Sequence, residues 1–366
     1  MRRIDELESL RGLMALWVLV GHAIHLLPIS ESGNLAIRLL KMNGLAVDVF
    51  IILSGFVIFY LLESANERYW PFIVRRFLRL YPCYLLCLVV SILMTQGNLD
   101  ILQSIPWTTE RIAVAQTIIL TSLDNFWPNI ASHIVLLQGA VPPSLIPYGE
   151  YAFLGQAWSI SLEWQFYLVA PLLFLICKKQ RRWALYLLLA SVCIAYWGTG
   201  FKFGEGWIFR QATYFFIGIS SFYIWRADFR LSPIWIMILM PLSITAVYLI
   251  VPRWLALGIW TVVFTSLLVV RQEGNRSIEG VICTVLQAKL LRWLGKISYS
   301  VYLTHMIIIY ATMRVLDGFE LSILHYSILL MALSFVGTLG VSDLTYRLVE
   351  RPAIVFGKGL FRAPSP

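Results

Sequence analysis

The segment GLAVDVFIILSGFVIFYLLES, residues 44–64, decides the fold class of this chain. Its only charged residues are Asp48 and Glu63, and the others are aliphatic, aromatic or small. A helix of this length rises about 31 Å, which matches the roughly 30 Å hydrocarbon core of a bilayer. Similar apolar stretches recur along the chain. The sequence therefore predicts an all-α protein, a polytopic integral membrane helical bundle.

The composition agrees with a lipid environment. Of the 366 residues, 59% are hydrophobic and 13% are charged, whereas soluble domains are roughly 45–50% apolar and about 25% charged. The mean hydropathy is +0.76. The net charge is +9, but the basic residues form short clusters between apolar stretches, which is typical of topology signals rather than of a nucleic-acid surface. We therefore expect membrane lipids, and no nucleic acid, as partners.

Hydropathy predicts about ten transmembrane helices, and an even number places both termini on one side of the membrane. Most Lys and Arg clusters fall on that side, so we expect both termini to be cytoplasmic. Residues 1–350 would form one transmembrane domain and residues 351–366 a short cytoplasmic tail. The predicted spans are 10–29, 44–64, 81–97, 157–177, 183–200, 207–225, 232–251, 255–270, 297–316 and 325–347.

The long outside connection, residues 98–156, contains moderately apolar stretches near 112–123 and 130–141. Both are shorter than a span, so they predict interfacial or re-entrant helices. The alternative is an additional pair of spans in this connection.

Two other signals are excluded. The start of the chain resembles a signal peptide, but Glu6, Glu8 and Arg11 precede or enter the apolar stretch and many spans follow, so we expect a retained helix. The five cysteines show neither a CxxC pair nor a Cys/His ligand spacing, so we expect no disulfide framework and no metal site.

The first predicted helix, ELESLRGLMALWVLVGHAIH (6–25), has the densest set of ionisable groups. Arg11 and His22 are eleven positions apart, which puts them on one helix face and about 16 Å apart along the axis. Glu8 shares this face and is close enough to pair with Arg11. Because ionisable groups are costly inside a membrane, this stripe is either a functional site or a polar helix contact with a snorkelling arginine.

The spacing of Arg11 and His22 resembles the opening motif of the membrane acyltransferase-3 family. The chain departs from the family's L-D-G-L-R-G by having Glu8 and Ser9 before Leu10, which puts the role of Glu8 in doubt. No segment resembles the SGNH-type domain that some relatives add, so the resemblance is to the stand-alone form. Five further motifs follow in the family's order: GLAVDVFIILSGFVIFY (44–60), FIVRRFLRLYP (72–82), WSISLEWQFYLVAP (158–171), LGKISYSVYLTH (294–305) and RLVERP (347–352).

Transfer of an acyl group to a hydroxyl needs a group that accepts the hydroxyl proton, and histidine suits this role near neutral pH. His22 is our choice, and the resemblance implies the same, because His22 occupies the position of the family's motif histidine. Arg11 is permanently charged. It could orient an acidic group, bind the acyl donor or hold helices together, and with the resemblance we place it in the catalytic or donor site.

Three arginines, Arg75, Arg76 and Arg79, lie in the basic family motif on the expected cytoplasmic side. Arginine suits bidentate contacts with phosphate, and acyl-CoA carries several phosphate charges. Ordinary positive-inside residues beside lipid headgroups would explain the cluster equally well. With the resemblance, we expect donor binding by these arginines and cannot rank them.

Polar residues in the second predicted helix have two interpretations. Asp48 shapes the site, for example by orienting a histidine, and we place it with His22 and Arg11 among the catalytic residues. Ser54 precedes Gly55, and packing between helices is the default interpretation of this pair. A role of Ser54 as an acyl-bearing nucleophile is the less favoured alternative, and we assign it to substrate binding.

Glu163 lies in an apolar helix, which demands a partner or a water-filled cavity. We assign Glu163 and Tyr167 to substrate binding. Tyr302 and His305 of the motif SYSVYLTH join this group, although His305 and His25 could equally be structural helix contacts. His133 and His325 are expected in loops or at the interface.

The resemblance implies an acyl-CoA-dependent O-acyltransferase. Its co-substrate would be acetyl-CoA or another acyl-CoA, with no bound cofactor, and its acceptor a hydroxyl of an extracytoplasmic carbohydrate or glycolipid. Relatives also acylate macrolide-like products or cytoplasmic acceptors. Family and size imply the bacterial inner (plasma) membrane. The oligomeric state is not predicted.

Two other classes compete with the enzyme. A transporter or flippase for a lipid-linked saccharide could use the same helices and buried charges, but the chain lacks two related halves with broken helices in matching positions. A noncatalytic scaffold would leave the buried polar residues with no role beyond helix packing. Consumption of a thioester distinguishes the enzyme from both.

Overall fold

The computed structural model describes residues 4–65, 67–178, 202–227, 254–273 and 278–361. Within these ranges the secondary structure is helical, with no strand. The chain forms two compact units, each built from separated stretches of sequence. Unit one contains residues 1–18, 42–64 and 213–298; unit two contains residues 19–41, 65–212 and 299–366.

Six helical segments are long and apolar enough to cross a membrane, which agrees with the predicted all-α integral membrane class. The predicted spans 183–200 and 232–251 lie outside the described residues, and the helices at the predicted spans 207–225 and 297–316 are not among the six. The total of ten and the location of the termini therefore stay predictions. The six are Asp5–His25, Gly44–Ala65, Tyr69–Ser104, Gly155–Lys178, Leu255–Gln272 and Ile323–Gly359.

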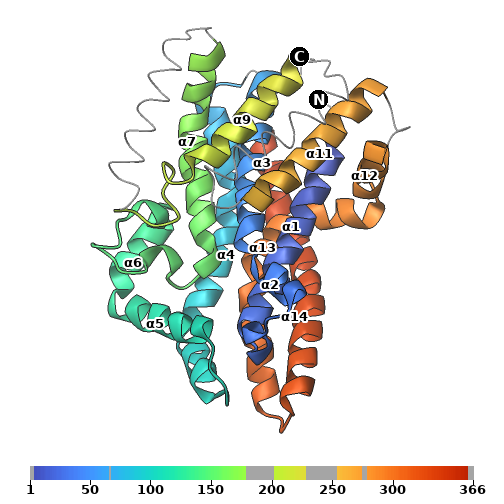
Figure 1. Ribbon diagram of the computed structural model, residues 1–366. Coiled ribbons are helices and arrows are strands. Elements are labelled where there is room, and N and C mark those ends of the chain that lie inside the picture. The colour runs from blue at the N-terminus through green and yellow to red at the C-terminus, as the bar shows by residue number, and fades with distance from the viewer. Residues whose placement is uncertain (1–3, 66, 179–201, 228–253, 274–277, 362–366) are drawn as a thin grey trace. The chain divides into compact units, whose positions relative to one another are not determined.

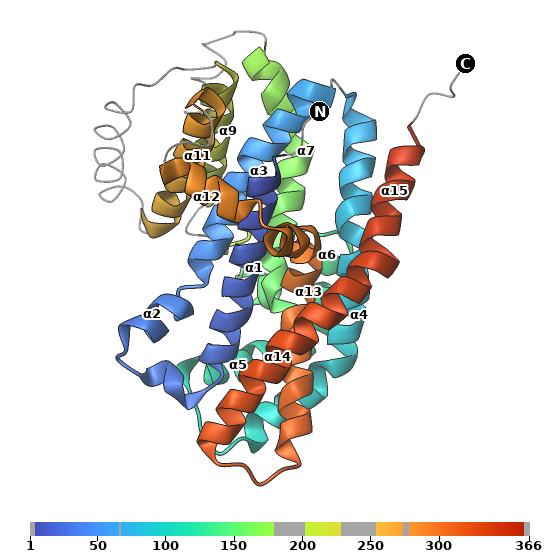
Figure 2. The same cartoon turned by 90° about the vertical axis from the view of Figure 1, so that its right-hand side faces the viewer.

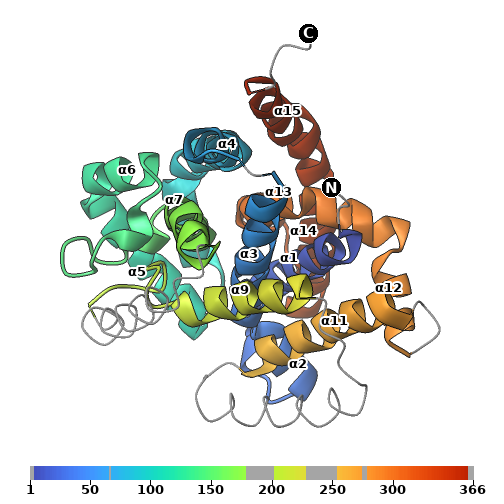
Figure 3. The same ribbon diagram turned by 90° about the horizontal axis from the view of Figure 1, so that it is seen from above.

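Unit one has an aromatic core between three helices: α3 (Gly44–Ala65), α9 (Ala212–Arg226) and α11 (Trp254–Glu273). The Phe56 ring lies 5.9 Å from the Trp260 ring and 6.5 Å from the Phe222 ring, measured between centroids. Trp260 donates its indole N–H to Ser221 Oγ at 3.0 Å, so its polar atom is satisfied in the core. The short helix α12 (Ile278–Leu286) packs beside α11 (Figure 3).

Glycines allow helices of unit one to touch through their backbones. A Cβ atom added to Gly55 on α3 would lie 2.4 Å from the Phe215 carbonyl oxygen, and one added to Gly218 on α9 would lie 2.0 Å from the Ile52 carbonyl oxygen. Such small-residue crossings are the usual way for membrane helices to pack closely. The structure therefore supports the packing interpretation of the Ser54-Gly55 pair.

A second glycine contact joins α1 (Asp5–His25) to α13 (Lys289–Asp317). A Cβ atom on Gly12 would lie 2.7 Å from the Gly295 backbone nitrogen, and one on Gly295 would lie 2.3 Å from the Glu8 carbonyl oxygen. Gly12 directly follows Arg11, and Gly295 is the second residue of the motif LGKISYSVYLTH (294–305). Each of these two helices begins in unit one and continues in unit two.

Unit two is organised by α4 (Tyr69–Ser104), a helix of 36 residues that runs beside α7 (Trp158–Lys178) (Figure 1). The predicted span 81–97 is only the middle of α4, which begins twelve residues earlier. Three arginines lower the hydropathy of the first turns, but they do not prevent the backbone from forming helix. Arg75, Arg76 and Arg79 therefore lie on α4 itself and not in a connecting segment.

The end of the chain also packs on α4. Helix α14 (Ile323–Thr345) continues through a short π-helix (Tyr346–Glu350) into α15 (Arg351–Gly359). Helix α15 lies against α4 (Figure 2). The first residues of the expected tail, 351–366, thus form an ordered helix.

The connection after α4 contains two short helices, α5 (Glu110–Asp124) and α6 (Phe126–Ile134). Neither is long enough to span a bilayer, which agrees with short helices near 112–123 and 130–141. The second ends earlier than expected, and three single-turn 3₁₀ helices follow it: η2 (Gln138–Ala140), η3 (Gly149–Tyr151) and η4 (Gly155–Ala157). We call residues 135–157 the buried connection after three of its polar residues, Gln138, Glu150 and Gln156, which are at most 9% exposed. Other residues of this segment, including Leu145 and Tyr148, are exposed.

We predict that Gly218→Ala destabilises unit one, because the new methyl group must push the α3 backbone away. Overpacking of this kind costs on the order of 1–3 kcal/mol, which a lower thermal-unfolding midpoint in detergent would show. Gly258→Ala on α11 is the matched control, since no atom lies within 4 Å of its added Cβ. Equal midpoints for both variants would contradict the close crossing.

Candidate functional site

The predicted site residues fall into both units. Unit one contains Arg11 on α1, with Asp48 and Ser54 on α3. Asp48 is fully buried and has interaction partners, as its desolvation cost requires. The remaining predicted residues belong to unit two: His22, Arg75, Arg76, Arg79, Glu163, Tyr167, Tyr302 and His305.

A pair of histidines is the first element of the site in unit two. The rings of His22 and His305 lie 5.2 Å apart between centroids and are tilted by 33°. His305 is fully buried, whereas His22 is half-buried. The two residues are 283 positions apart in sequence, so the fold, and not local spacing, brings them together. Sequence reasoning had assigned them separate roles.

The hydrogen bonds of His305 identify its free nitrogen. Its Nδ1 lies 3.3 Å from the Val301 carbonyl oxygen, one turn earlier on α13. A carbonyl only accepts, so Nδ1 carries the proton, and the neutral ring has an unprotonated Nε2. Nε2 is buried and has no hydrogen-bond partner among the described residues. By contrast, the neighbouring His25 uses its Nε2 in a 3.1 Å contact with the Lys41 carbonyl oxygen.

Tyr302 links the histidine pair to α7. Its ring lies 6.0 Å from that of His305, and its hydroxyl donates to the Gln156 carbonyl oxygen at 2.9 Å. Ser159 Oγ lies 2.7 Å from the same hydroxyl. Gln156 in turn donates its amide to the Leu303 carbonyl oxygen at 2.7 Å. These bonds fix the start of α7 against α13.

Helix α7 continues the polar residues on one face. Ser159, Glu163 and Tyr167 are spaced at four-residue intervals, so they lie above one another along about 12 Å of helix. The Tyr167 hydroxyl donates to the Glu163 carboxylate. The Arg76 guanidinium lies 5.8 Å from the centroid of the Tyr167 ring, a cation–π distance.

Together these residues form one continuous series within unit two, which we call the polar track. It runs from the histidine pair along α7 to the arginine on α4. Every step is a ring contact, a hydrogen bond or a one-turn spacing on a helix. Its members are His22, His305, Tyr302, Ser159, Glu163, Tyr167 and Arg76.

The three arginines of the basic motif differ in their surroundings. Arg76 also lies 5.8 Å from the centroid of the Phe72 ring, which is adjacent to the Tyr167 ring. Arg75 lies 3.1 Å from a carboxylate oxygen of Glu67 and 5.6 Å from the Phe361 ring. Arg79 has its own interaction partners. Arg76 thus contacts another predicted site residue, Tyr167, directly.

Sequence reasoning missed the buried connection and His133. This histidine is fully buried rather than in an exposed loop. Its Nε2–H donates to the Gly149 carbonyl oxygen at 3.2 Å, and the Tyr84 hydroxyl lies 3.0 Å from Nδ1 and donates to the His133 carbonyl oxygen. His133 thus joins α4 to the connection that carries Gln156. Burial lowers the pKa of His133 to about 4.

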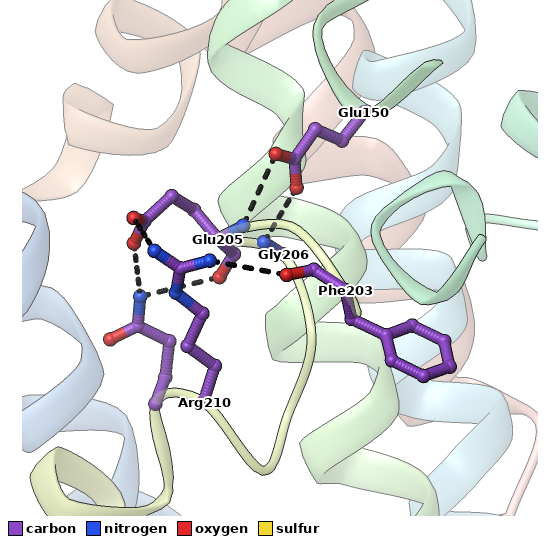
Figure 4. Close-up of polar contacts among 6 residues, drawn as sticks. Glu150, Phe203, Glu205, Gly206 and Arg210 are labelled. Atoms are coloured by element: carbon purple, nitrogen blue, oxygen red, sulfur yellow. Dashed lines mark hydrogen bonds and ion pairs between the residues drawn. The ribbon is translucent and has the colours of Figure 1, made fainter. Parts of the chain in front are cut away.

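Glu150 anchors the segment before α9 to the buried connection (Figure 4). Its carboxylate accepts the backbone N–H groups of Glu205 at 3.1 Å and Gly206 at 2.7 Å. Burial raises the pKa of Glu150, and these two hydrogen bonds oppose the rise. Gln165 on α7 donates to the Gly206 carbonyl oxygen at 2.8 Å. The segment is therefore fixed to α7 two residues from Glu163.

The cysteines of the described residues form no disulfide. Cys83, Cys87, Cys177 and Cys283 are free, and Cys193 lies outside the described residues. In the described ranges, no three His, Cys, Asp or Glu side chains are arranged to hold a metal ion. The expectation of no metal site stays a prediction.

The helices and the polar track define a polytopic integral membrane protein with buried ionisable groups. The family model described as "Acyltransferase domain" matches residues 4–347. The chain therefore belongs to the acyltransferase-3 family, and its activity is acyl transfer in a membrane.

Two curated relatives agree with this assignment. One is Acyltransferase MdmB of Streptomyces mycarofaciens, 24% identical over 349 residues that cover 86% of this chain and 82% of the relative. The other is BcsY of Komagataeibacter xylinus, whose name describes a membrane-bound transacylase. It is 31% identical over 208 residues, covering 54% of this chain and 45% of the relative. No solved structure matches the chain.

We predict that His133 makes stability pH-dependent. Its pKa of about 4 in the folded protein is below the unfolded value of about 6.5. Its contribution is therefore complete above pH 6.5 and is lost as the pH falls through 4. The difference corresponds to about 3 kcal/mol.

The measurement is the unfolding midpoint in detergent at several values between about pH 7 and pH 4. His133→Gln, which cannot titrate, should lose less stability over this range than the parent. His325→Gln is the control, because His325 is exposed and should leave the pH dependence of the parent unchanged. Identical curves for the parent and His133→Gln would refute this account.

Proposed function

We propose that this protein transfers an acyl group, most simply acetyl, from cytoplasmic acyl-CoA to a hydroxyl of an extracytoplasmic carbohydrate or glycolipid. The observation that carries the proposal is the polar track of unit two. It connects an arginine suited to phosphate with a histidine pair suited to proton transfer. The names of the two relatives, an acyltransferase and a transacylase, support the reaction class.

The chemistry needs one base. The acceptor hydroxyl attacks the thioester carbonyl, its proton passes to His22, and the C–S bond breaks to release CoA thiolate. The thiolate then takes the proton from His22, so the products are an ester and CoA. His22 is half-buried, which leaves part of its ring accessible to the reacting groups. This assigns it the role of general base.

The donor would bind at the arginine end of the track. Arg76, which lies over the adjacent rings of Phe72 and Tyr167, would present a planar cation to the phosphates of CoA. Arg75 and Arg79 on the same helix add positive charge. Arg11 and Asp48 belong to unit one, and we propose a role in the reaction for both, with Arg11 orienting an acidic group or the thioester.

The acceptor would bind at the histidine end. The hydroxyl and carboxylate groups of Ser159, Tyr302 and Glu163 are the hydrogen-bonding types that recognise sugar hydroxyls. For Ser54 on α3, in unit one, the proposed role is also substrate binding. The basic clusters support cytoplasmic termini, and a bacterial inner membrane would then give access to CoA on one side and glycans on the other.

We predict that purified protein in liposomes releases CoA from acetyl-CoA when methyl glycosides are supplied, and that His22→Asn does so on the order of 10²–10⁴-fold more slowly. CoA release is measured with a thiol reagent, and folding by thermal shift. His25→Asn is the matched control, one turn further along α1. It should retain activity because its ring already contacts the Lys41 carbonyl oxygen.

Two results would contradict different parts of this proposal. If the folded parent neither binds acetyl-CoA nor releases CoA with any glycoside, the proposal is wrong. If His22→Asn retains the parent rate, the reaction class stands and the assignment of His22 as base is wrong.

We predict that Arg76→Gln raises the KM for acetyl-CoA about 10–100-fold, the loss expected for a hydrogen bond to a charged group, with a smaller effect on kcat. The KM for acetyl-pantetheine, which lacks the nucleotide phosphates, should change little. Arg347→Gln is the control, because Arg347 is exposed and pairs with Asp343 on its own helix. Equal changes for both donors would exclude a phosphate contact by Arg76.

A further inference from the structure

We infer that His305 is the proton-relay partner of His22, a positioning residue whose Nε2 lone pair accepts the N–H of the His22 imidazolium during acyl transfer. This inference rests on the proposed function, in which His22 takes the hydroxyl proton. It adds a second histidine to the reaction and gives it a specific atom and a specific protonation state.

The first observation is proximity. The centroids of the two rings are 5.2 Å apart and the planes are tilted by only 33°. A nitrogen lies little more than 1 Å from the centre of an imidazole ring, so rotation of the half-buried His22 ring can bring one of its nitrogens within hydrogen-bond reach of His305. His25 is further from His22, at 6.4 Å.

The second observation is the fixed tautomer of His305. Its Nδ1–H is directed to the Val301 carbonyl oxygen, which leaves Nε2 as an acceptor only. This acceptor is buried without a hydrogen-bond partner among the described residues. Other buried atoms, such as Gln138 Oε1 and Gln156 Oε1, also have no partner, but His305 Nε2 belongs to a ring that lies 5.2 Å from the ring of His22. An acceptor that waits for a charged N–H during the reaction would account for this atom.

The third observation is the rigid support of His305. The hydroxyl of Tyr302, one turn before His305, donates a hydrogen bond to the Gln156 carbonyl oxygen and also contacts Ser159 Oγ on α7. The Gln156 side-chain amide donates to the Leu303 carbonyl oxygen. These contacts fix the turn of α13 on which His305 lies. A residue that accepts a proton-bearing group needs this precision, because hydrogen bonds weaken steeply with misalignment.

A purely structural role explains these observations less well. A helix contact at this position needs neither a nitrogen nor a particular tautomer, and an apolar side chain would avoid the unpaired Nε2. The half-buried His22 ring also needs a group that orients it, as catalytic histidines generally do. Among the residues of unit two, His305 contacts the His22 ring directly.

The proton balance is simple. The acceptor hydroxyl loses its proton to one nitrogen of His22, which becomes an imidazolium while the thioester C–S bond breaks. The other His22 N–H is donated to His305 Nε2, which stays neutral because two positive rings this close would repel each other. The CoA thiolate then removes one proton from the pair, and both rings are neutral again. No oxidant, reductant or further reactant is needed.

The experiment compares two substitutions of His305, each of which replaces the hydrogen-bonding role of one ring nitrogen. In His305→Asn the amide N–H takes the place of Nδ1–H and keeps the bond to Val301, but the acceptor at Nε2 is lost. In His305→Gln the longer side chain places an amide oxygen near the Nε2 position, where it can accept from His22. A structural role favours Asn, and a relay role favours Gln.

CoA release from acetyl-CoA is measured in liposomes with the same methyl glycosides, and folding is followed by thermal shift. We expect His305→Asn to lower kcat on the order of 10²-fold, with the KM for acetyl-CoA within about two-fold of the parent. His305→Gln should recover most of this loss. His25→Gln is the matched control and should keep the parent kcat.

A double substitution keeps the inference testable if one variant folds poorly. Residues that act as a unit show strongly non-additive losses, so His305→Gln and His305→Asn should have the same kcat in the background of His22→Asn. If Asn and Gln are equivalent in the parent background, or if His305→Asn retains the parent kcat, the relay is excluded while the proposed function stands. If the parent neither binds nor cleaves acetyl-CoA, the proposed function fails, and the relay with it.

Discussion

The cost of burying polar groups among apolar helices is the constraint on which the rest of this structure depends. In the bilayer core there is no water, and lipid tails form no hydrogen bonds. A buried donor or acceptor there lowers its cost by finding a protein partner. Unit two meets this requirement through extended networks: Tyr302 with Gln156, His133 with Gly149, and Glu150 with the backbone of Glu205 and Gly206. Several buried atoms of unit two, including Gln138 Oε1, Gln156 Oε1 and His305 Nε2, have no hydrogen-bond partner among the described residues. Of these three, His305 Nε2 belongs to a ring that lies 5.2 Å from the ring of His22.

The same constraint explains the buried connection. A segment without regular helix exposes its backbone groups, so at depth it must bond to the helices around it. Gln138 donates to the Ala157 carbonyl oxygen, Ser161 accepts from Gly139, and Gln156 donates to Leu303. These bonds position the first turn of α7, from which Ser159 reaches Tyr302. The close glycine crossings in unit one have a different physical basis, since they bring helices together through backbone contact and leave no room for a side chain.

Sequence patterns predicted the elements of this fold better than their contacts. Long apolar stretches identify α1, α3 and α7 because length and hydropathy are local properties. The start of α4 was predicted too late, since hydropathy penalises arginines that an amphipathic helix accommodates. Pairing of His22 with His305 could not be predicted from their spacing, because residues so far apart in sequence meet only through tertiary packing. For the same reason the three arginines could not be ranked: only the folded chain shows Arg76 over the adjacent rings of Phe72 and Tyr167, and Arg75 beside Glu67. His133 was misplaced because nothing in its neighbourhood shows that Tyr84 and Gly149 bury it.

The polar track gives a physical meaning to the spacing of the family motifs. The motif WSISLEWQFY contributes three members of the track at intervals of four residues, which is the spacing that stacks side chains along one face of a helix. The motif SYSVYLTH contributes Tyr302 and His305, three residues apart, so both lie on neighbouring positions of one turn. The opening helix contributes His22, and the basic motif contributes Arg76. Each of these four motifs thus contributes at least one residue to the polar track of unit two. In the proposed reaction, the phosphates of the donor would lie at the end of the track that carries Arg76, and the thioester would lie at the end that carries His22. This order fits a phosphorylated donor and an uncharged hydroxyl acceptor.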